Sequence, residues 1–304
     1  MSWLAKQIQA VLREKKDAAT ALKTMMEDVL VKYRNRHDDH QLRVHDKNGE
    51  GILYGKRKYV AVNAETKALE LKCSRKKFNE KKEEAFSRGL FNQKRLAIGG
   101  HDALLISYEA PLLRKLSGQG GGVCKLDLVA LEEAAIWAIE YKQTSDLATS
   151  ARYGVLEALA YGFLLALHLR DSQEGVRLQV EECIVRRGPY PCPSVTLKSN
   201  TIKFAVAAPP AFYREDVCTN ERLHLTETIC KLACEYANDA SNLLRIKLSF
   251  GGFIVVGDDN TRLRCEPASG ESTEVTTRFV PPPKSLPVFD NISELRDSLE
   301  KIQR

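Results

Sequence analysis

The sequence predicts an α/β fold, and three observations support this. Two apolar stretches of strand length, 123–131 and 135–142, are separated by only a few residues and so predict an antiparallel hairpin. A longer stretch rich in Ala, Leu and Tyr, 147–170, predicts one long helix after that hairpin. The overall composition, 43% hydrophobic and 28% charged in 304 residues, is typical of a globular chain and excludes disordered, collagen-like and coiled-coil-only proteins.

The other elements follow from apolar spacing and turn residues. Residues 2–34 repeat apolar side chains every three to four positions and predict one or two helices, whose apolar stripe packs either on the chain's own domain or on a second copy or protein partner. Short strands are predicted within 41–73 and a helix over 78–90. The remaining predictions are strands at 103–110, 176–186, 201–207 and 246–256, and helices at 221–245 and 292–302.

Positive charge is concentrated at the start of the chain. The formal net charge is +6, but residues 1–100 hold 23 basic and 13 acidic side chains, a net +10, so the remainder has a net −4. Lys and Arg clusters bind the phosphate backbone of nucleic acids. We therefore expect a nucleic acid partner, and the predicted contact residues are Lys56, Arg57, Lys58, Arg75, Lys76 and Lys77.

The cysteines and the apolar stretches bear on the compartment. The eight cysteines include no CxxC pair, and the first residues lack the apolar block of a signal peptide, so we expect reduced thiols in a cytoplasmic or nuclear protein. The longest apolar stretch, 155–169, is about 15 residues long and contains Glu157 and His168, whereas a membrane span needs about 20 residues. We expect no contact with a membrane.

The most informative pattern is a set of charges in the predicted hairpin. Because side chains alternate across a strand, Glu140 and Lys142 project from the same face. Asp127 shares that face if the hairpin loop has an even number of residues: a loop of two would set it opposite Ala138, and a loop of four opposite Glu140. An odd loop would leave unpaired charge in apolar surroundings, at a cost of several kcal/mol. We therefore expect an even loop.

This charge set suits metal-assisted hydrolysis. Two carboxylates on one face are hard oxygen ligands that favour Mg²⁺ or Mn²⁺. A neighbouring lysine can orient or deprotonate the attacking water and offset negative charge on a phosphorus-centred transition state. The alternative is a purely structural ion pair between Glu140 and Lys142.

The spacing of these residues resembles that of a known superfamily. Asp127, an interval of 13 residues, Glu140-x-Lys142 and a following long helix resemble the PD-(D/E)xK nuclease superfamily, which has the restriction-endonuclease-like fold. The Gly-rich segment before Asp127 and the sequence Glu157-Ala-Leu-Ala-Tyr161 are similar to motifs of its RecB-like and λ-exonuclease-like branches. The chain departs from the second motif in having Glu157 where those branches have Gln.

The resemblance implies an architecture. It covers residues 76–213, which would form a core of a mixed β-sheet flanked by helices. Residues 1–75 would be a basic helical and β region before this core, and residues 214–304 a helix–strand extension after it.

The resemblance also implies roles for residues. Asp127 and Glu140 would hold the metal, and Lys142 would act on the water. A glutamate of the first core helix reaches the metal in many members; Glu80, Glu83 and Glu84 compete for this role, and Glu80 is preferred because it comes early in the helix. Three further residues are candidates for catalysis or, alternatively, for plain surface and packing positions: Glu109, Glu157 and Tyr161.

These observations predict an enzyme, a Mg²⁺-dependent (or Mn²⁺-dependent) nuclease that hydrolyses phosphodiester bonds, with DNA as the expected substrate. Two alternatives stay open. One is a non-catalytic nucleic-acid-binding or assembly protein on the same fold, and the other is a hydrolase of small phosphate compounds.

Overall fold

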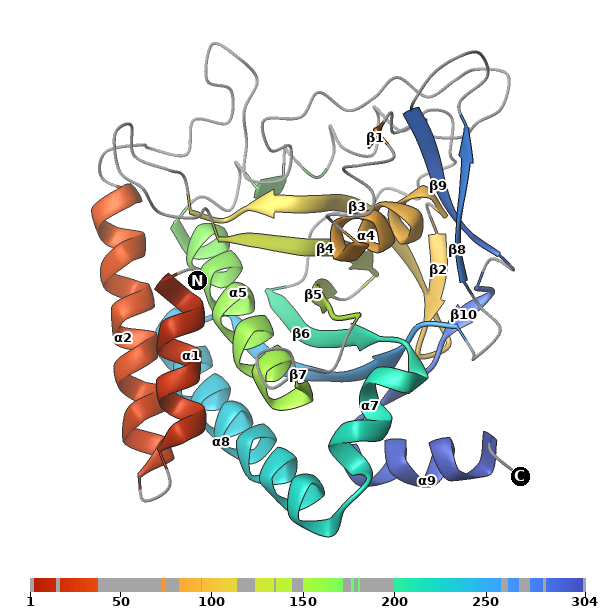
Figure 1. Ribbon diagram of the computed structural model, residues 1–304. Coiled ribbons are helices and arrows are strands. Elements are labelled where there is room, and N and C mark those ends of the chain that lie inside the picture. Colours follow the sequence, from red (N-terminus) through yellow and green to blue (C-terminus); the bar gives the residue numbers. More distant parts are fainter. Residues whose placement is uncertain are drawn as a thin grey trace.

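A computed structural model describes most of the chain and shows a mixed α/β protein (Figure 1). An eight-stranded mixed sheet lies between helices, which confirms the α/β class and the mixed sheet. The described residues are 3–14, 17–37, 73–74, 82–93, 95–113, 124–133, 135–143, 150–171, 176–177, 180, 200–257, 262–267, 274–280 and 283–302.

The large sheet combines antiparallel and parallel pairing. From β2 to β5 each strand runs antiparallel to its neighbour, whereas β5, β6 and β7 are parallel to one another. A small sheet contains β1 (Cys73–Ser74), β9 (Glu274–Val280) and β8 (Arg262–Pro267). The large sheet has the order β10 (Ser285–Leu286), β2 (Arg95–Ile98), β3 (His101–Pro111), β4 (Lys125–Glu132), β5 (Ala135–Tyr141), β6 (Thr201–Ala208), β7 (Lys247–Val255) and β11 (Val288–Phe289).

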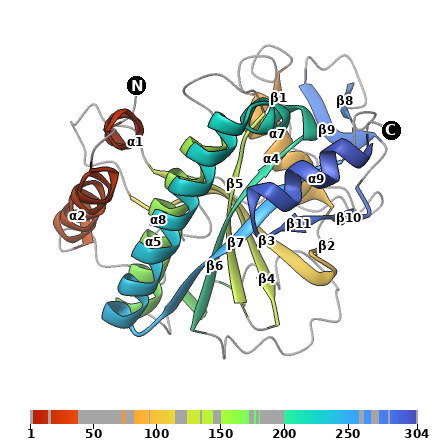
Figure 2. The same ribbon diagram turned by 90° about the horizontal axis from the view of Figure 1, so that it is seen from below.

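Helices cover both faces of this sheet (Figure 2). On one face α5 (Ala151–Asp171) packs on β5 and β6 and lies beside α8 (Asn220–Leu244). The opposite face carries α4 (Lys82–Asn92), which contacts β3, β4 and β5. Two separate apolar cores result, one on each face. The other helices are α1 (Trp3–Arg13), α2 (Ala18–His37), α7 (Pro210–Val217) and α9 (Ile292–Ile302).

The amino-terminal helices use their apolar stripe within the chain. Leu4, Ile8 and Val11 of α1 are fully buried, and α1 and α2 both pack on α5. The stripe therefore belongs to the protein's own core. The alternative expectation, in which this stripe docks on a second copy or a protein partner, is wrong because the side chains that would form the contact are already covered.

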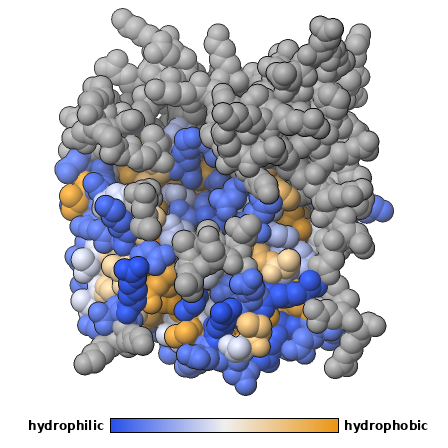
Figure 3. All heavy atoms as spheres, in the orientation of Figure 1, coloured by the Kyte–Doolittle hydropathy of each residue, from blue (hydrophilic) through white to orange (hydrophobic). Residues whose placement is uncertain are grey.

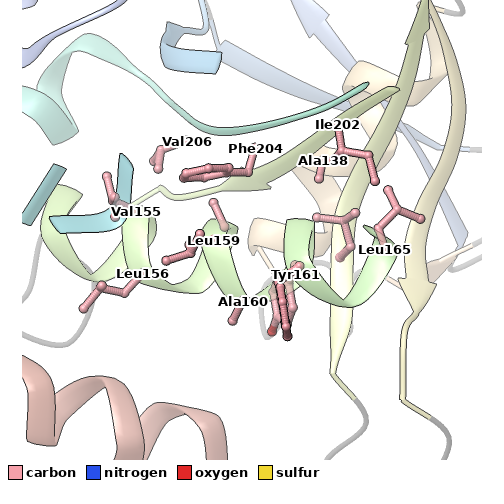
Figure 4. Close-up of a cluster of buried hydrophobic side chains, with 14 of the residues drawn as sticks. Ala138, Val155, Leu156, Leu159, Ala160, Tyr161, Leu165, Ile202, Phe204 and Val206 are labelled. Atoms are coloured by element: carbon pink, nitrogen blue, oxygen red, sulfur yellow. The ribbon is translucent and has the colours of Figure 1, made fainter. Parts of the chain in front are cut away.

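Helix α5 packs closely on β6, where its Leu159 points toward Phe204 (Figure 4). Two glycines of α5 allow this approach. A Cβ atom on Gly162 would lie 2.9 Å from Phe204 Cβ, and one on Gly154 would lie 2.9 Å from Val206 Cγ1. Real Cβ atoms do not approach other carbons this closely, so any larger residue would push the helix off the sheet. The glycines thus hold α5 at the distance from which its side chains reach β5.

Gly162→Ala should destabilise the protein. The new methyl group would meet Phe204 Cβ, which cannot move without shifting β6, and overpacking of this kind costs about 1–3 kcal/mol. Alanine regains about 1 kcal/mol of helix propensity, so we expect the free energy of unfolding to fall by up to about 2 kcal/mol in urea unfolding. Asn238→Ala at an exposed position of α8 is the comparison, because it gains helix propensity without such an approach; a Gly162→Ala protein that gains as much stability as Asn238→Ala would contradict the packing argument.

A buried aspartate fixes the start of α5. Asp216 of α7 accepts a hydrogen bond from the Ala151 backbone N–H, 2.8 Å away. Burial raises the pKa of Asp216, and this hydrogen bond opposes the rise. A carboxylate at a helix amino terminus accepts a hydrogen bond from a backbone N–H that has no partner within the helix, and its negative charge is attracted to the positive end of the helix dipole. The first turn of α5 is therefore held from a helix 65 residues further along the chain.

A five-residue segment, Ser285–Phe289, joins the two edges of the large sheet. Its first two residues form β10 on β2, and its last two form β11 on β7. Backbone hydrogen bonds from Gly99 to Leu286 and from Val255 to Pro287 continue the two contacts. Five extended residues reach at most about 18 Å, so the sheet must curve until its edges are that close. We call this segment the strap.

Two expectations from the sequence differ from the structure or fall outside it. A strand was expected to begin at Val176, but Val176, Arg177 and Val180 are helical. Val176 and Val180 are both buried, and their spacing of four places them on one face of a helix. Residues four apart also share one face of a strand, so the apolar pattern of so short a stretch does not distinguish the two. The strands expected within 41–73 lie outside the described residues, apart from β1 at their end.

The described part of the face shown in Figure 3 is largely polar, with scattered apolar residues. The large apolar side chains exposed there include Val31, Leu225 and Leu243, which are single positions of the kind found on most proteins. Among the helices that the structure describes, none combines the length and apolar character that crossing a bilayer requires. In the described ranges the thiols of Cys218, Cys230 and Cys234 form no disulfide bond, and the expectation of reduced thiols stays a prediction.

Candidate active site

The β4–β5 register brings the two predicted carboxylates face to face. The hairpin pairs run from Glu132↔Ala135 to Leu128↔Ile139, so two residues separate the strands and the next position sets Asp127 opposite Glu140. The even loop is confirmed. Asp127 lies opposite Glu140, the arrangement expected for a loop of four, although the loop has two residues: β4 ends at Glu132, one residue later than expected, whereas β5 begins at Ala135 as expected.

Asp127 is held by the backbone of the neighbouring strand. Its Oδ2 atom accepts a hydrogen bond of 2.9 Å from the Tyr141 N–H. Asp127 is buried, and its side chain belongs to the face of the sheet that α5 covers, together with Glu140 and Lys142. The hydrogen bond fixes the carboxylate at the end of the hairpin.

Lys142 lies between two carboxylates from different elements. Its Nζ donates to Glu140 Oε1 at 2.8 Å and lies 2.7 Å from Glu157 Oε2 of α5. The Tyr161 hydroxyl donates to the other oxygen of Glu157, at 3.1 Å. The α5 face with Glu157 and Tyr161 therefore meets the hairpin charges, and of the two interpretations left open, the packing edge is wrong.

The cluster holds more negative than positive groups. The pKa of Asp127 is raised to about 8, first by burial and then by the nearby negative charges of Glu109 and Glu83. The charge of Lys142 and the hydrogen bond from the Tyr141 N–H oppose this rise. Burial followed by Asp127 raises the pKa of Glu140 well above its ordinary value. Burial alone would lower the pKa of Lys142, but Glu140, Glu157 and Asp127 raise it well above its ordinary value, so the lysine keeps its proton.

These residues fit a divalent cation. Glu140 Oε2 is buried and has no hydrogen-bond partner, which is costly for a carboxylate oxygen and is relieved by a cation ligand. Mg²⁺ is commonly bound by one or two carboxylates, with water and phosphate oxygens as the other ligands. In the described ranges no group of three or more His, Cys, Asp or Glu side chains is arranged to hold a metal ion, so the fit rests on the pair Asp127 and Glu140.

Glu83 of α4 is the one of the three predicted helix glutamates whose side chain the structure describes. Glu80 lies outside the described residues, whereas the charge of Glu83 raises the pKa values of both Asp127 and Tyr141 after the effect of burial. Three positions further along α4, Phe86 stacks on the Tyr141 ring with 5.3 Å between ring centroids. That contact turns the face with Glu83 toward the hairpin end. The sequence offered the spacing of three between Glu83 and Phe86 as a signal for Glu83, whereas the preference for Glu80 stays a prediction.

Glu109 lies at the edge of the site and contacts a lysine. Its Oε2 is 2.7 Å from Lys125 Nζ, and its charge is felt by Asp127. Its proposed catalytic role is therefore less direct than that of Glu140, which contacts Lys142 itself. The predicted nucleic-acid contacts, which comprise Lys56, Arg57, Lys58, Arg75, Lys76 and Lys77, lie outside the described residues and stay a prediction.

Comparisons with known proteins add no assignment: no protein-family model, no curated protein and no solved structure matches the chain.

The raised pKa of Asp127 predicts how stability depends on pH. The unfolded side chain loses its proton near pH 3.8, whereas the folded one keeps it up to about pH 8. Between these values the folded state binds more protons, so the free energy of unfolding falls as pH rises, by at most about 1.4 kcal/mol per pH unit from this group. Urea unfolding in EDTA at a series of pH values measures this free energy of unfolding. The stability of wild type minus that of Asp127→Asn should decrease toward pH 8, and an increase would contradict the assignment.

Proposed function

We propose that the protein is a metal-dependent nuclease that hydrolyses phosphodiester bonds in DNA. The observation that carries the proposal is the buried set of three carboxylates, Asp127, Glu140 and Glu157, around a single lysine. A structural ion pair needs one acid for one base; the surplus acids either take up protons, as the raised pKa values of Asp127 and Glu140 indicate for the protein without metal, or are offset by a bound cation. The mixed sheet, its hairpin and the long helix over the same face support a restriction-endonuclease-like core for residues 76–213.

The residues divide the chemistry between them. Asp127 and Glu140 would hold Mg²⁺ or Mn²⁺, which supplies an activated water and a clamp on phosphate oxygens when bound. Lys142 is a cation in this setting, and so it acts by donating hydrogen bonds to the attacking water or to a phosphate oxygen rather than by accepting a proton. Glu157, fixed by the Tyr161 hydroxyl, holds the ammonium group in place.

The test is cleavage of linear and circular DNA with Mg²⁺, Mn²⁺ or EDTA. Wild type should cleave with metal and not with EDTA, and Asp127→Asn should not cleave in either condition. Glu132→Gln is a matched control, because Glu132 is a buried carboxylate of the same strand that bonds to Trp137 and Lys203 at the opposite end of the hairpin. Cleavage of the circular substrate would identify an endonuclease.

Two outcomes would overturn the proposal. If wild type binds DNA in a salt-sensitive way but does not cleave it with either metal, the binding-protein alternative replaces the nuclease. If Asp127→Asn cleaves as fast as Glu132→Gln, the carboxylate pair is not the active site.

A further inference from the structure

A row of acidic residues crosses three strands at the edge of the candidate site. In the β3–β4 pairing, Tyr108 is opposite Leu128 and Ala110 is opposite Leu126, which sets Glu109 opposite Asp127. Asp127 in turn faces Glu140 on β5. Opposite residues of antiparallel strands share a face, so Glu109 continues the Asp127–Glu140 pair toward the side of β3.

Lys125 is the cation beside this row that solvent can reach. It lies two residues before Asp127 on β4 and so has its side chain on the same face. Its side chain is 41% exposed, compared with 6% for Lys142. Its Nζ is 2.7 Å from Glu109 Oε2. In the protein without substrate, Lys125 is therefore already paired with the carboxylate of Glu109.

The backbone at Glu109 is in an uncommon conformation. Its φ angle is +52°, in the left-handed region, which residues other than glycine adopt only at a steric cost. Such positions concentrate at functional sites, where contacts of the native structure hold them. At Glu109 the contact that the structure provides is the pair with Lys125.

A phosphodiester that approaches the site meets like charge from Glu109 and Glu157, and from Asp127 and Glu140 wherever these two are ionised. Coulomb repulsion between the phosphate and these carboxylates must be offset by a cation that the phosphate can contact. Lys142 is poorly placed for a first contact, because it is buried and two of its three N–H donors already serve Glu140 and Glu157. Lys125 is exposed. Its one ion pair within the described residues is with Glu109, whose carboxylate a phosphate group can replace.

We propose that Lys125 is a substrate-binding residue that exchanges Glu109 for a phosphate oxygen of the nucleic acid. Glu109 then acts as an internal competitor, which holds Lys125 over the row until substrate arrives. This inference rests on the proposed function, because it takes a nucleic acid as the substrate of the same site.

The exchange predicts effects of opposite sign for the two partners. Lys125→Ala removes a phosphate contact and should weaken binding about tenfold, with a shallower dependence on salt. Glu109→Gln removes the competing charge and should strengthen binding several-fold. Lys125→Arg keeps the cation and should bind like wild type, which distinguishes a lost charge from a disturbed strand.

The experiment measures binding without cleavage. A fluorescent DNA duplex is titrated with each variant in EDTA by anisotropy, over a series of NaCl concentrations. Lys203→Ala is the control, because Lys203 pairs with the carboxylate of Glu132 at the other end of the hairpin. The expected result is a rise in Kd and a loss of about one unit of log–log salt slope for Lys125→Ala alone.

The inference and the proposed function fail in different ways. A Kd and slope for Lys125→Ala equal to those of Lys203→Ala, weaker binding by Glu109→Gln, or no binding by wild type would overturn the inference. If the Lys125 and Glu109 effects appear but no metal supports cleavage, the nuclease proposal fails while the phosphate contact stands.

Discussion

Glu140→Gln is expected to abolish metal-dependent cleavage while leaving the metal-free protein at least as stable as wild type, within about 1 kcal/mol. Glutamine removes one of three buried acidic groups, and Lys142 keeps its contact of 2.7 Å with Glu157. At the position of the unpartnered Glu140 Oε2 the variant has a neutral amide group, which costs less to bury than a carboxylate. In wild type, Mg²⁺ should raise the melting temperature because it binds only the folded state, and in Glu140→Gln this shift should be absent.

A structural ion pair predicts the reverse. If Glu140 and Lys142 served stability alone, removing one partner of the buried pair would cost about 3–5 kcal/mol, and Mg²⁺ would not change the melting temperature of either protein. Urea unfolding in EDTA and thermal unfolding with added Mg²⁺ measure both quantities. A large loss of stability in EDTA together with no Mg²⁺ shift in wild type would refute the metal site.

Lys142→Ala is expected to lower both cleavage and stability. Without the ammonium group, Glu140 and Glu157 lose their shared partner in a buried position, which should lower the free energy of unfolding by about 3–5 kcal/mol. Removing a cation that stabilises transition-state charge costs about a hundredfold or more in rate. Cleavage is therefore measured at a temperature where circular dichroism shows that the variant is folded.

Two variants separate the causes of the expected loss. Lys203→Ala removes the lysine partner of Glu132 at the far end of the hairpin and should retain cleavage. The double variant Lys142→Ala with Glu157→Gln removes one of the two buried carboxylates that lost their partner, so it should recover part of the stability but none of the cleavage. Recovery of cleavage in the double variant would remove Lys142 from the mechanism.

The hairpin and its charges could be predicted because strand periodicity is a strong constraint. Alternation places Glu140 and Lys142 on one face, and the cost of burying unpaired charge fixes the parity of the loop. Parity alone did not choose between Ala138 and Glu140 as the residue opposite Asp127, since that choice depends on where each strand ends. Only the three-dimensional pairing settles it.

Other features depend on contacts between distant elements, which the sequence does not encode locally. The choice of Glu83 follows from the stacking of Phe86 on Tyr141, residues more than 50 positions apart. The contact of Glu157 with Lys142 depends on how closely α5 approaches β6, which the Gly154 and Gly162 positions allow. The strap was not predicted because strands of two residues have no periodicity.

The strap has a consequence for how the chain folds. Ser285 pairs with Ala97, so the contact closes a loop of 188 residues, and contacts of such long separation form late because the lost chain entropy is repaid only when they are complete. Until then both β2 and β7 present unpaired backbone N–H and C=O groups, which recruit strands from other molecules. During synthesis the sheet stays open until residue 289 has left the ribosome, and this interval is when the protein most needs chaperone protection.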